Sequence, residues 1–494
     1  MDINDNGRLH LQMFSVHGLL RSQNMELGFD ADTGGQIKYV VELGKALSEN
    51  KGVRQVDLFT RLIRDDTLDD DYSRQVEIVT DKFRIVRIPC GPPRYIRKEL
   101  LWPYLDEFIK KTLEFNEKQG IVPDLIHGHY PDAGYVALKL CDTYDIPFIY
   151  TGHSLGRTKK KNLVANGVDP DELNKQIKVD HRIRMEEEVL ARADIVVAST
   201  RQEIDEQYAD YNNCSSADYT VIPPGIDVAK FAPFYQDECR EDLEIRERQF
   251  ARQSIKEELE RFLVAPEKPM VLTLCRPDER KNIEGLIEAY GEDKDLQLMA
   301  NLVIFAGIRK DIKDEQGSAR EVLTRMLLMM DKYNLYGKMA IPKKHDFETE
   351  VPELYRMAAE YHGVFVNPAL NEPFGITLLE ASASGLPIVA TQNGGPKEII
   401  EKCKSGLMVD PGDSKEIAAA VKKIITHKEQ WRTFSRNGIF NTQELYTWKA
   451  HAKTYVDLLK NKIDQTRMAS RIFSHLEKTI IPENSAVSSV VPPL

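Results

Sequence analysis

The sequence predicts an α/β protein with two doubly wound parallel sheets. Short apolar runs alternate with amphipathic helical stretches along most of the 494 residues. The alternation occurs in two series, one before and one after the Pro-Pro-Gly at 223–225. Because 42% of the residues are hydrophobic, the chain can bury the large cores that two such domains require.

The first series contains seven candidate strands separated by helical patterns. Apolar residues recur at helical spacing from Ile37 to Leu47, with the small Gly44 on the same face. Since strands that alternate with helices pair in parallel, we expect one doubly wound sheet. The candidate strands are 10–16, 55–60, 83–88, 124–127, 147–151, 195–199 and 219–222.

The second series predicts a similar sheet. Its candidate strands are 271–275, 302–306, 339–341, 364–366, 388–390 and 407–409. We place the domain boundary near Gly225, which gives domains of 1–225 and 226–448. The charged stretch 236–267 is expected to be a solvated helix, and the Ser-, Val- and Pro-rich 484–494 a flexible tail. Two such domains suit a ligand held in a cleft at the carboxyl ends of both sheets.

Composition excludes several classes of partner. The formal net charge of −11 argues against nucleic acid or an anionic membrane surface. The start MDINDNGRLH lacks a signal-peptide pattern, and no run of about eighteen apolar residues follows. Six scattered cysteines without a CxxC pair argue against a zinc site or a disulfide framework. We therefore expect a cytoplasmic protein with reduced thiols.

The stretch NPALNEPFGITLLE, residues 367–380, is the strongest candidate for a ligand site. A strand-like run precedes it, Pro and Gly punctuate the loop, and Ile376 begins an apolar run with helical spacing. A helix N-terminus after a strand offers free N–H groups and positive potential to a phosphate. Glu372 and Glu380 bracket this start, about 12 Å apart along the axis. The arrangement suits a nucleotide sugar, and a surface loop with two solvated glutamates is the alternative.

Two further segments are suited to phosphate. Gly34 and Gly35 directly precede the first helical pattern, where a backbone without side chains can approach a ligand closely. Arg276 and Lys281 follow the first strand of the second series and could both reach a diphosphate. A basic loop balanced by the two acids between these cations is the alternative.

Other motifs give only weak support to a dinucleotide site, a metal site or a phosphatase nucleophile. No GxGxxG follows the first strand, so a dinucleotide fingerprint is absent from that place. The Asp pair ending at Asp32 does not follow an apolar strand, which argues against a metal or a phosphatase nucleophile. For His127 and His129 we expect hydrogen bonds to a ligand rather than a metal. His153 follows a strand end and would point into the cleft mouth, or serve as an ordinary loop residue.

Taken together, these residues resemble the pattern of retaining nucleotide-sugar glycosyltransferases of the GT-B fold. In that fold two Rossmann-like domains face each other across a cleft. Longer motifs are similar to those of the sucrose-phosphate synthases, glycosyltransferase family 4 type, over their glucosyltransferase domain. These motifs lie between about Met13 and Trp448: HGLLRSQNMELGFDADTGGQIKYVVELGKAL, KELLWPYL, HGHYPDAG, TGHSLGRTK, ASTRQEIDEQ, IPPGID, RPDERKN and NGGPKEII.

The resemblance implies a donor site for UDP-glucose, with Arg276 and Lys281 against the diphosphate. Glu372 would hold the glucose hydroxyls, and His153 would contact the glucose near its reacting centre. These four are the catalytic residues that the resemblance implies, and Glu380 would accept the ribose hydroxyls. The full donor-binding set is Gly34, Gly35, Arg276, Lys281, Glu372, Phe374, Gly375, Ile376, Thr377 and Glu380.

The resemblance also implies an acceptor site for fructose 6-phosphate. Gln36 and Tyr130 would hold the sugar, and Lys98, Lys159 and Arg182 would surround the phosphate. The products would be sucrose 6-phosphate and UDP, formed with retention. No metal would be obligatory, although Mg²⁺ could stimulate the reaction.

Several implications concern the rest of the protein and its relatives. A C-terminal helix at about 449–483 would cross back to the first domain, and a separate sucrose-phosphate phosphatase would act on the product. Lys159 favours a phosphorylated acceptor because a dianion requires cations. The alternatives are a sucrose synthase that uses free fructose, a mannosylfructose-phosphate synthase that uses GDP-mannose, and a non-catalytic sensor of nucleotide sugar or sugar phosphate.

Overall fold

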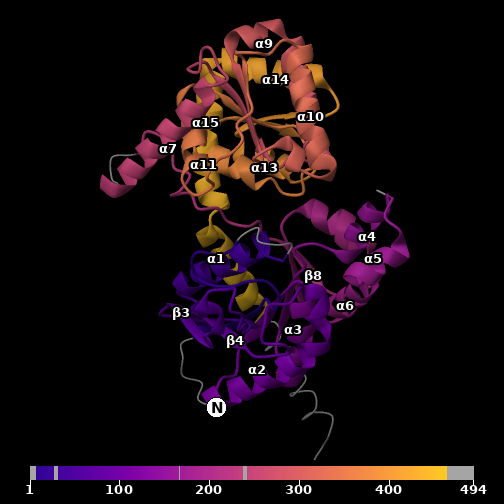
Figure 1. Ribbon diagram of the computed structural model, residues 1–494. Coiled ribbons are helices and arrows are strands. Elements are labelled where there is room, and N and C mark those ends of the chain that lie inside the picture. Colours follow the sequence, from indigo (N-terminus) through magenta and orange to yellow (C-terminus); the bar gives the residue numbers. More distant parts are fainter. Residues whose placement is uncertain (1–6, 27–31, 166, 237–241, 464–494) are drawn as a thin grey trace, which may run out of the picture. The chain divides into compact units, whose positions relative to one another are not determined.

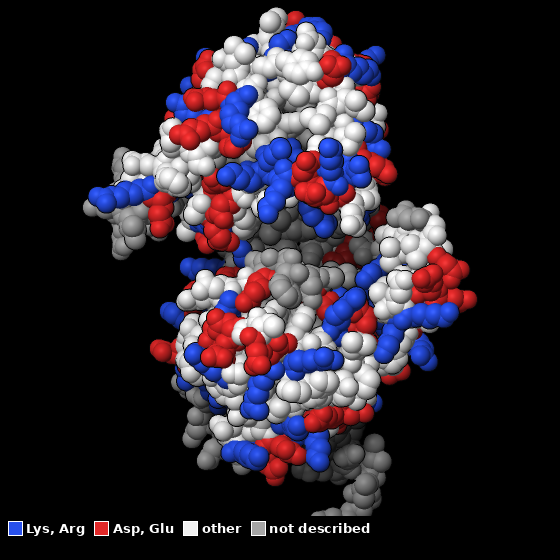
Figure 2. Space-filling model, in the orientation of Figure 1, with Lys and Arg blue, Asp and Glu red and all other residues white. Residues whose placement is uncertain are grey.

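The computed structural model describes residues 7–26, 32–165, 167–236 and 242–463 (Figure 1). The chain divides into two compact units, Met1–Ile149 with Ala452–Leu494, and Tyr150–His451. This division passes through β6, whereas the expected domain boundary near Gly225 follows β8, and that boundary stays a prediction. Acidic and basic side chains are interspersed over the visible face, as Figure 2 shows.

The first sheet has the strand order β3-β4-β2-β1-β5-β6-β7-β8. The expected strands are confirmed, and an edge strand, β3, is added that pairs antiparallel with β4. The strands are β1 (Leu9–Phe14), β2 (Val53–Arg61), β3 (Val76–Thr80), β4 (Phe83–Ile88), β5 (Leu125–His129), β6 (Phe148–Thr151), β7 (Ile195–Ala198) and β8 (Asp218–Val221). The helices are α1 (Gly35–Glu49), α2 (Leu105–Gln119), α3 (Pro131–Tyr144), α4 (Gly156–Ala165), α5 (Pro170–Ile177) and α6 (Val179–Arg192).

The second sheet has the strand order β11-β10-β9-β12-β13-β14, and its paired strands are parallel. Its strands are β9 (Met270–Cys275), β10 (Asn301–Ala306), β11 (Met339–Ala340), β12 (Val364–Asn367), β13 (Ile388–Thr391) and β14 (Gly406–Val409). The helices are α7 (Asp242–Glu260), α8 (Ile283–Glu292), α9 (Lys294–Met299), α10 (Gly317–Lys332), α11 (Glu350–Glu360), α12 (Ile376–Ala383), α13 (Gly395–Cys403), α14 (Ser414–Thr426) and α15 (Lys428–Leu445).

Both faces of the inner strands of this second sheet are buried, because successive residues of β9, β10, β12 and β13 enter different hydrophobic clusters. In β10, for example, Val303 and Phe305 belong to one cluster, while Leu302 and Ile304 belong to the other. Strands buried on both faces read as continuous apolar runs, which is why the sequence located them well.

The charged stretch 236–267 is helical over α7, as expected, but it is not merely solvated. Ala251, Ile255 and Leu259 are buried on one side of α7. Its polar residues also bind α11, since Arg248 pairs with Glu353. Helix α7 is therefore part of the second domain's packing.

Two segments that flank the second series lie side by side. The N–H of Ile226 donates to the carbonyl of Tyr446 at 2.8 Å, and His451 Nδ1 contacts the carbonyl oxygen of Pro223 at 2.8 Å. A helix then runs over 448–463. The rest of the expected crossover helix to 483, and the expected flexible tail 484–494, lie outside the described residues.

This last described helix lies against β5. The hydroxyl of Tyr455 contacts Nδ1 of His127 at 2.7 Å, and the two rings stack with centroids 5.5 Å apart. Both side chains are almost fully buried. This contact occupies Nδ1 of His127, and the expected hydrogen bonds of His127 and His129 to a ligand stay predictions.

Candidate functional site

The turn from β12 to α12 begins with a glycine in the left-handed region. Gly375 has φ 94°, and it is the N-cap of α12 without a side-chain hydrogen bond to the helix. A Cβ at this position would lie 2.5 Å from Leu378 Cδ1. Only glycine meets both demands without strain. The first N–H groups of α12 therefore lack the side-chain cap that many helices have.

A second loop holds the segment that carries Glu372. The N–H of Glu372 donates to the carbonyl of Asn393, and the carbonyl of Glu372 accepts from the N–H of Gly395 at 3.0 Å. Asn393 Nδ2 also donates to the carbonyl of Leu370 at 2.9 Å. These contacts give the NGGP sequence at 393–396 a structural role, because they fix the backbone of the segment that contains Glu372.

The basic loop after β9 separates its cations into two groups. Arg280 pairs with Asp278 at 2.7 Å, and the hydrogen bond from Arg280 lowers the pKa of Asp278 to about 2. Lys281 Nζ instead pairs with Glu372 Oε2 at 2.5 Å. Arg276 is exposed, and no ion pair to it is found among the described residues. Arg276 and Lys281 line the pocket described next, whereas Arg280 is not among its lining residues.

These elements enclose a pocket of about 310 Å³ at the carboxyl ends of β9 and β12. Six expected donor residues line it, namely Arg276, Lys281, Glu372, Gly375, Ile376 and Thr377. Cys275, His345 and Asn367 also line it, although they are not among the residues expected from the sequence. Asn367 Nδ2 donates to Glu372 Oε2 at 3.1 Å and so fixes the carboxylate that faces Lys281.

Burial affects two titratable groups of this pocket. It raises the pKa of the Cys275 thiol to about 12 and lowers the pKa of His345. Both groups are therefore neutral at physiological pH, and the pocket's charge comes from its cations and Glu372. Nothing in the sequence distinguished His345, because it lies in a loop about 70 residues from the basic loop.

Four expected donor residues lie outside this lining: Gly34 and Gly35, which belong to the first unit, and Glu380 and Phe374. Glu380 is 4% exposed on α12, where it accepts a hydrogen bond from the hydroxyl of Tyr355 at 3.3 Å. Phe374 is partly buried and packs against the core of the second sheet. The pocket therefore contains most, but not all, of the expected donor set.

In the first unit, the expected residues gather at the carboxyl ends of the adjacent strands β1 and β5. Gly34 and Gly35 are exposed at the start of α1. Gln36 Nε2 donates to the hydroxyl of Ser15 at 3.1 Å and to the carbonyl of His129 at 3.3 Å. Tyr130 precedes α3 with φ 81°. Gln36 and Tyr130 therefore lie at the ends of neighbouring strands.

Carboxylates that the sequence did not assign support this group. The N–H of Lys98 donates to Asp32 Oδ2 at 2.8 Å, and its ammonium forms an ion pair with the same carboxylate. His17 Nδ1 contacts Asp132 Oδ2 at 2.8 Å, and its ring lies edge-on to Tyr130 with centroids 4.6 Å apart. Asp32 and Asp132 are nearly buried, which ties Lys98 and His17 in place.

The remaining expected residues lie near the turn between β6 and α4, in the second compact unit. His153 has φ 56°, and Lys159 is partly buried in α4. Arg182 is 6% exposed, pairs with Glu186 at 2.9 Å and donates to the carbonyl of Ser154 at 2.5 Å. The partners of Arg182 that the structure describes are therefore side chains and backbone of the protein itself.

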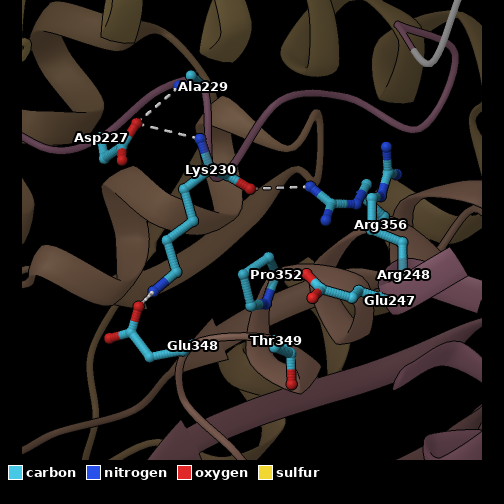
Figure 3. Close-up of a pocket in the computed structure, with 9 residues that line it drawn as sticks. All are labelled: Asp227, Ala229, Lys230, Glu247, Arg248, Glu348, Thr349, Pro352 and Arg356. Carbon is cyan, nitrogen blue, oxygen red and sulfur yellow. Dashed lines mark hydrogen bonds and ion pairs between the residues drawn. The ribbon is translucent and has the colours of Figure 1, made fainter. Parts of the chain in front are cut away.

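A different pocket, of about 430 Å³, contains none of the expected site residues (Figure 3). Lys230 pairs with Glu348 at 2.6 Å, and Asp227 accepts from the N–H groups of Ala229 and Lys230. Arg356 Nη1 donates to the carbonyl of Lys230 at 2.9 Å. Because these charges are matched internally, this pocket is a weaker candidate.

The described residues contain neither a cluster suited to a metal ion nor a helix suited to cross a membrane. Over 7–26, 32–165, 167–236 and 242–463, no group of three or more His, Cys, Asp or Glu side chains has the arrangement of a metal site. Within the same part of the chain, no helix is both long enough and apolar enough to cross a bilayer.

Two family models match the chain. The model described as Glycosyltransferase Family 4 matches residues 33–230, and the model described as Glycosyl transferases group 1 matches residues 254–439. A sucrose-phosphate synthase of Zea mays is 42% identical over 92% of this chain and 47% of its own length. A probable sucrose-phosphate synthase 2 of Arabidopsis thaliana is 40% identical over 91% and 47%. The chain spans about half the length of these curated relatives.

Solved structures agree with this assignment. A sucrose-phosphate synthase from Thermosynechococcus elongatus is 26% identical, with a TM-score of 0.63 over 93% of this chain and 100% of that one. The catalytic domain of starch synthase IV from Arabidopsis thaliana, bound to ADP and acarbose, shares the fold at 15% identity and a TM-score of 0.60 over 92% and 100%. The chain therefore belongs to the glycosyltransferases of the GT-B fold and groups with the sucrose-phosphate synthases.

Proposed function

We propose that this glycosyltransferase transfers glucose, with retention, from UDP-glucose to fructose 6-phosphate and forms sucrose 6-phosphate and UDP. The observation that carries the proposal is the pocket at the start of α12. It combines N–H groups without a side-chain cap, Arg276 and Lys281, and a carboxylate, Glu372, held by Asn367. Helix N-termini and cations bind a diphosphate, and a fixed carboxylate suits sugar hydroxyls.

The chemistry that we propose needs no carboxylate nucleophile. The bond between the anomeric carbon and the β-phosphate oxygen breaks, and the acceptor hydroxyl oxygen bonds to the same face of that carbon. The acceptor proton passes to the leaving phosphate. Arg276, Lys281 and the N–H groups of Gly375 to Thr377 stabilise the charge that this phosphate gains. His153 contacts the glucose, and Glu380 and Phe374 complete the donor site around the nucleoside.

On the acceptor side, Gln36 and Tyr130 bind fructose, and Lys98, Lys159 and Arg182 bind its phosphate. Gly34 and Gly35 offer their N–H groups to the donor phosphates. Support comes from the first unit, where hydrogen bonds hold Gln36 and Lys98 and the ring of His17 packs edge-on against Tyr130. A bound dianion would compete with Asp32 for the ammonium of Lys98.

The variant Lys159→Ala tests the phosphorylated acceptor. We expect the KM for fructose 6-phosphate to rise by about 10–100-fold, because a charge-assisted hydrogen bond contributes about 1.5–3 kcal/mol. The KM for UDP-glucose should stay near the wild-type value. Lys161→Ala is the matched control, since Lys161 is exposed on the same helix. Equal increases of both KM values would contradict the acceptor assignment.

Product analysis tests the function as a whole. The enzyme is offered UDP-glucose, ADP-glucose or GDP-mannose, each with fructose 6-phosphate and with free fructose. Sucrose 6-phosphate from the phosphorylated acceptor alone supports the proposal. Similar turnover of free fructose would favour a sucrose synthase, and a preference for GDP-mannose a mannosylfructose-phosphate synthase. Binding without multiple-turnover release of UDP would favour a sensor.

Three further proposals follow from the same function. No metal is obligatory, so EDTA should leave turnover intact while Mg²⁺ could raise it. A separate phosphatase would consume the phosphorylated product. The cytoplasm is the proposed compartment, where both substrates would meet the enzyme.

A further inference from the structure

The turn between β6 and α4 holds an unusual backbone conformation. His153 has φ 56°, in the left-handed region, and the N–H of Ser154 donates back to the carbonyl of Gly152 at 2.6 Å. A residue with a side chain in such a region is strained, and this conformation persists only where its surroundings fix it. The groups that fix this turn therefore matter to the direction of the His153 side chain.

Side chains from outside the turn bind four of its polar backbone groups. Tyr208 and Tyr211 accept from two N–H groups, Arg182 donates to a carbonyl, and Glu186 accepts from a third N–H. The contacts are Gly152 N to Tyr208 Oη at 3.0 Å, Arg182 Nη2 to Ser154 O at 2.5 Å, Gly156 N to Glu186 Oε2 at 3.0 Å, and Arg157 N to Tyr211 Oη at 3.1 Å.

The carboxylate of Glu186 accepts hydrogen bonds from three of the groups in this set. The Glu186 side chain is fully buried, and its carboxylate accepts from Gly156 N, from Arg182 Nε at 2.9 Å and from the Tyr211 hydroxyl. Burial and the neighbouring Glu186 raise the pKa of Tyr211, so its hydroxyl remains a donor. A buried carboxylate needs such partners, because an uncompensated one is strongly destabilising.

The start of α4 is built closely around this carboxylate. A Cβ on Gly156 would lie 2.7 Å from Glu186 Oε2 and 2.9 Å from Ile183 Cγ1. The backbone can therefore approach the carboxylate only at a glycine. Glu186 occupies the position at a helix N-terminus where an external anion binds in other proteins.

We propose that Glu186 is a positioning residue for glucosyl transfer. Through Arg182, Tyr211 and Gly156 it sets the turn that directs His153, and it holds Arg182 at the same time. This inference rests on the proposed function, in which His153 contacts the transferred glucose and Arg182 the acceptor phosphate. Glu186 itself touches neither substrate.

The test is Glu186→Gln, which keeps the size but removes the charge and places an amide N–H₂ against donors. We expect kcat to fall by about 100-fold, because a displacement of about 1 Å in a reacting group can have that effect. The Kd of UDP, measured by calorimetry, should stay at the wild-type value, since Glu186 is not among the residues that line the donor pocket. Glu188→Gln, an exposed change on the same helix, should leave both values unchanged.

A second variant and a second readout keep the test decisive. Tyr211→Phe removes one of the carboxylate's donors and should lower kcat by about 10-fold, as expected for the loss of a hydrogen bond of about 1.4 kcal/mol. The NMR signal of the His153 imidazole should shift in Glu186→Gln and Tyr211→Phe but not in Glu188→Gln. This signal reports the turn even if the wild-type enzyme fails to make sucrose 6-phosphate, an outcome that would refute the proposed function alone.

Two results would overturn the inference. One is a kcat for Glu186→Gln equal to that of Glu188→Gln with an unshifted His153 signal. The other is a parallel loss of UDP binding, folded fraction and kcat in both Glu186→Gln and Tyr211→Phe, which would assign Glu186 a purely structural role.

Discussion

The starts of α12 and α4 make an instructive pair. Each helix follows a parallel strand through a turn with a left-handed residue, Gly375 or His153, and each has a cation nearby. At α4 the buried Glu186 accepts from the first N–H group. At α12 no side chain caps the helix, and its start lines a pocket. A helix N-terminus after a strand therefore predicts a phosphate site only where the protein does not supply its own anion.

The largest effect is expected for Lys281→Ala, which removes the cation beside the uncapped helix. We expect kcat to fall by about 10²–10³-fold, in analogy with the loss of one oxyanion donor. Steady-state UDP release measures this. Arg280→Ala is the matched control, because Arg280 is exposed and bound to Asp278 in the same loop. Wild-type kcat in Lys281→Ala would remove Lys281 from the diphosphate site.

The next variant makes α12 resemble α4 by adding an internal anion. Thr377→Glu places a carboxylate in the first turn, and we expect the Kd of UDP to rise by about 100-fold, because like charges in contact cost several kcal/mol. The free energy of unfolding should remain the same or increase by about 0.5 kcal/mol through the helix dipole. Calorimetry and chemical denaturation measure the two quantities.

Thr377→Gln separates charge from size in this experiment. It adds a similar volume without a charge, so UDP binding should be weakened much less than in Thr377→Glu. Equal losses in both variants would mean that the start of α12 excludes bulk rather than attracts negative charge.

The smallest effect on stability is expected at Asp278, in the short turn next to the pocket. Asp278 caps the short helix Glu279–Lys281, and its lowered pKa means that the charged form is favoured in the folded protein. Its contribution is present above the unfolded pKa of about 3.9 and is lost as the pH falls toward 2. Since Asp278 is partly exposed, we expect less than about 1 kcal/mol.

Denaturation of wild type and Asp278→Asn at several pH values tests this prediction. The difference in the free energy of unfolding between them should be largest near neutral pH and shrink as the pH falls from 5 to 2. A difference that does not change with pH would show that the cap acts through geometry rather than charge.

The sequence predicted the fold well because apolar runs report burial directly. The parallel strands were located almost to the residue, since strands buried on both faces are continuously apolar. The edge strand β3 was missed because Val76 and Ile78 are exposed on it, and a short exposed run gives no burial signal. The packing of α7 was also missed, because its three buried apolar residues, Ala251, Ile255 and Leu259, lie among many charged ones.

The sequence predicted part of the site. The residues that it did not predict are those whose contacts come from segments far away along the chain. The motif residues of the donor pocket lie within two segments, so local spacing could identify them. Glu186, Glu187 and Glu188 are the same residue type in a row, and only the packing of the folded chain distinguishes the buried Glu186 from the exposed Glu188. Asp32 and His345 likewise acquire their surroundings from segments distant along the chain.

The contact between His127 and Tyr455 has a consequence for synthesis of the chain. The two residues are 328 positions apart in one compact unit. At about 5–20 residues per second, a ribosome needs roughly 16–66 s to pass from one to the other. During this interval the imidazole on β5 lacks its hydroxyl partner while the second sheet is made and can fold. The unit that begins first is therefore completed last, after translation has passed the whole second domain.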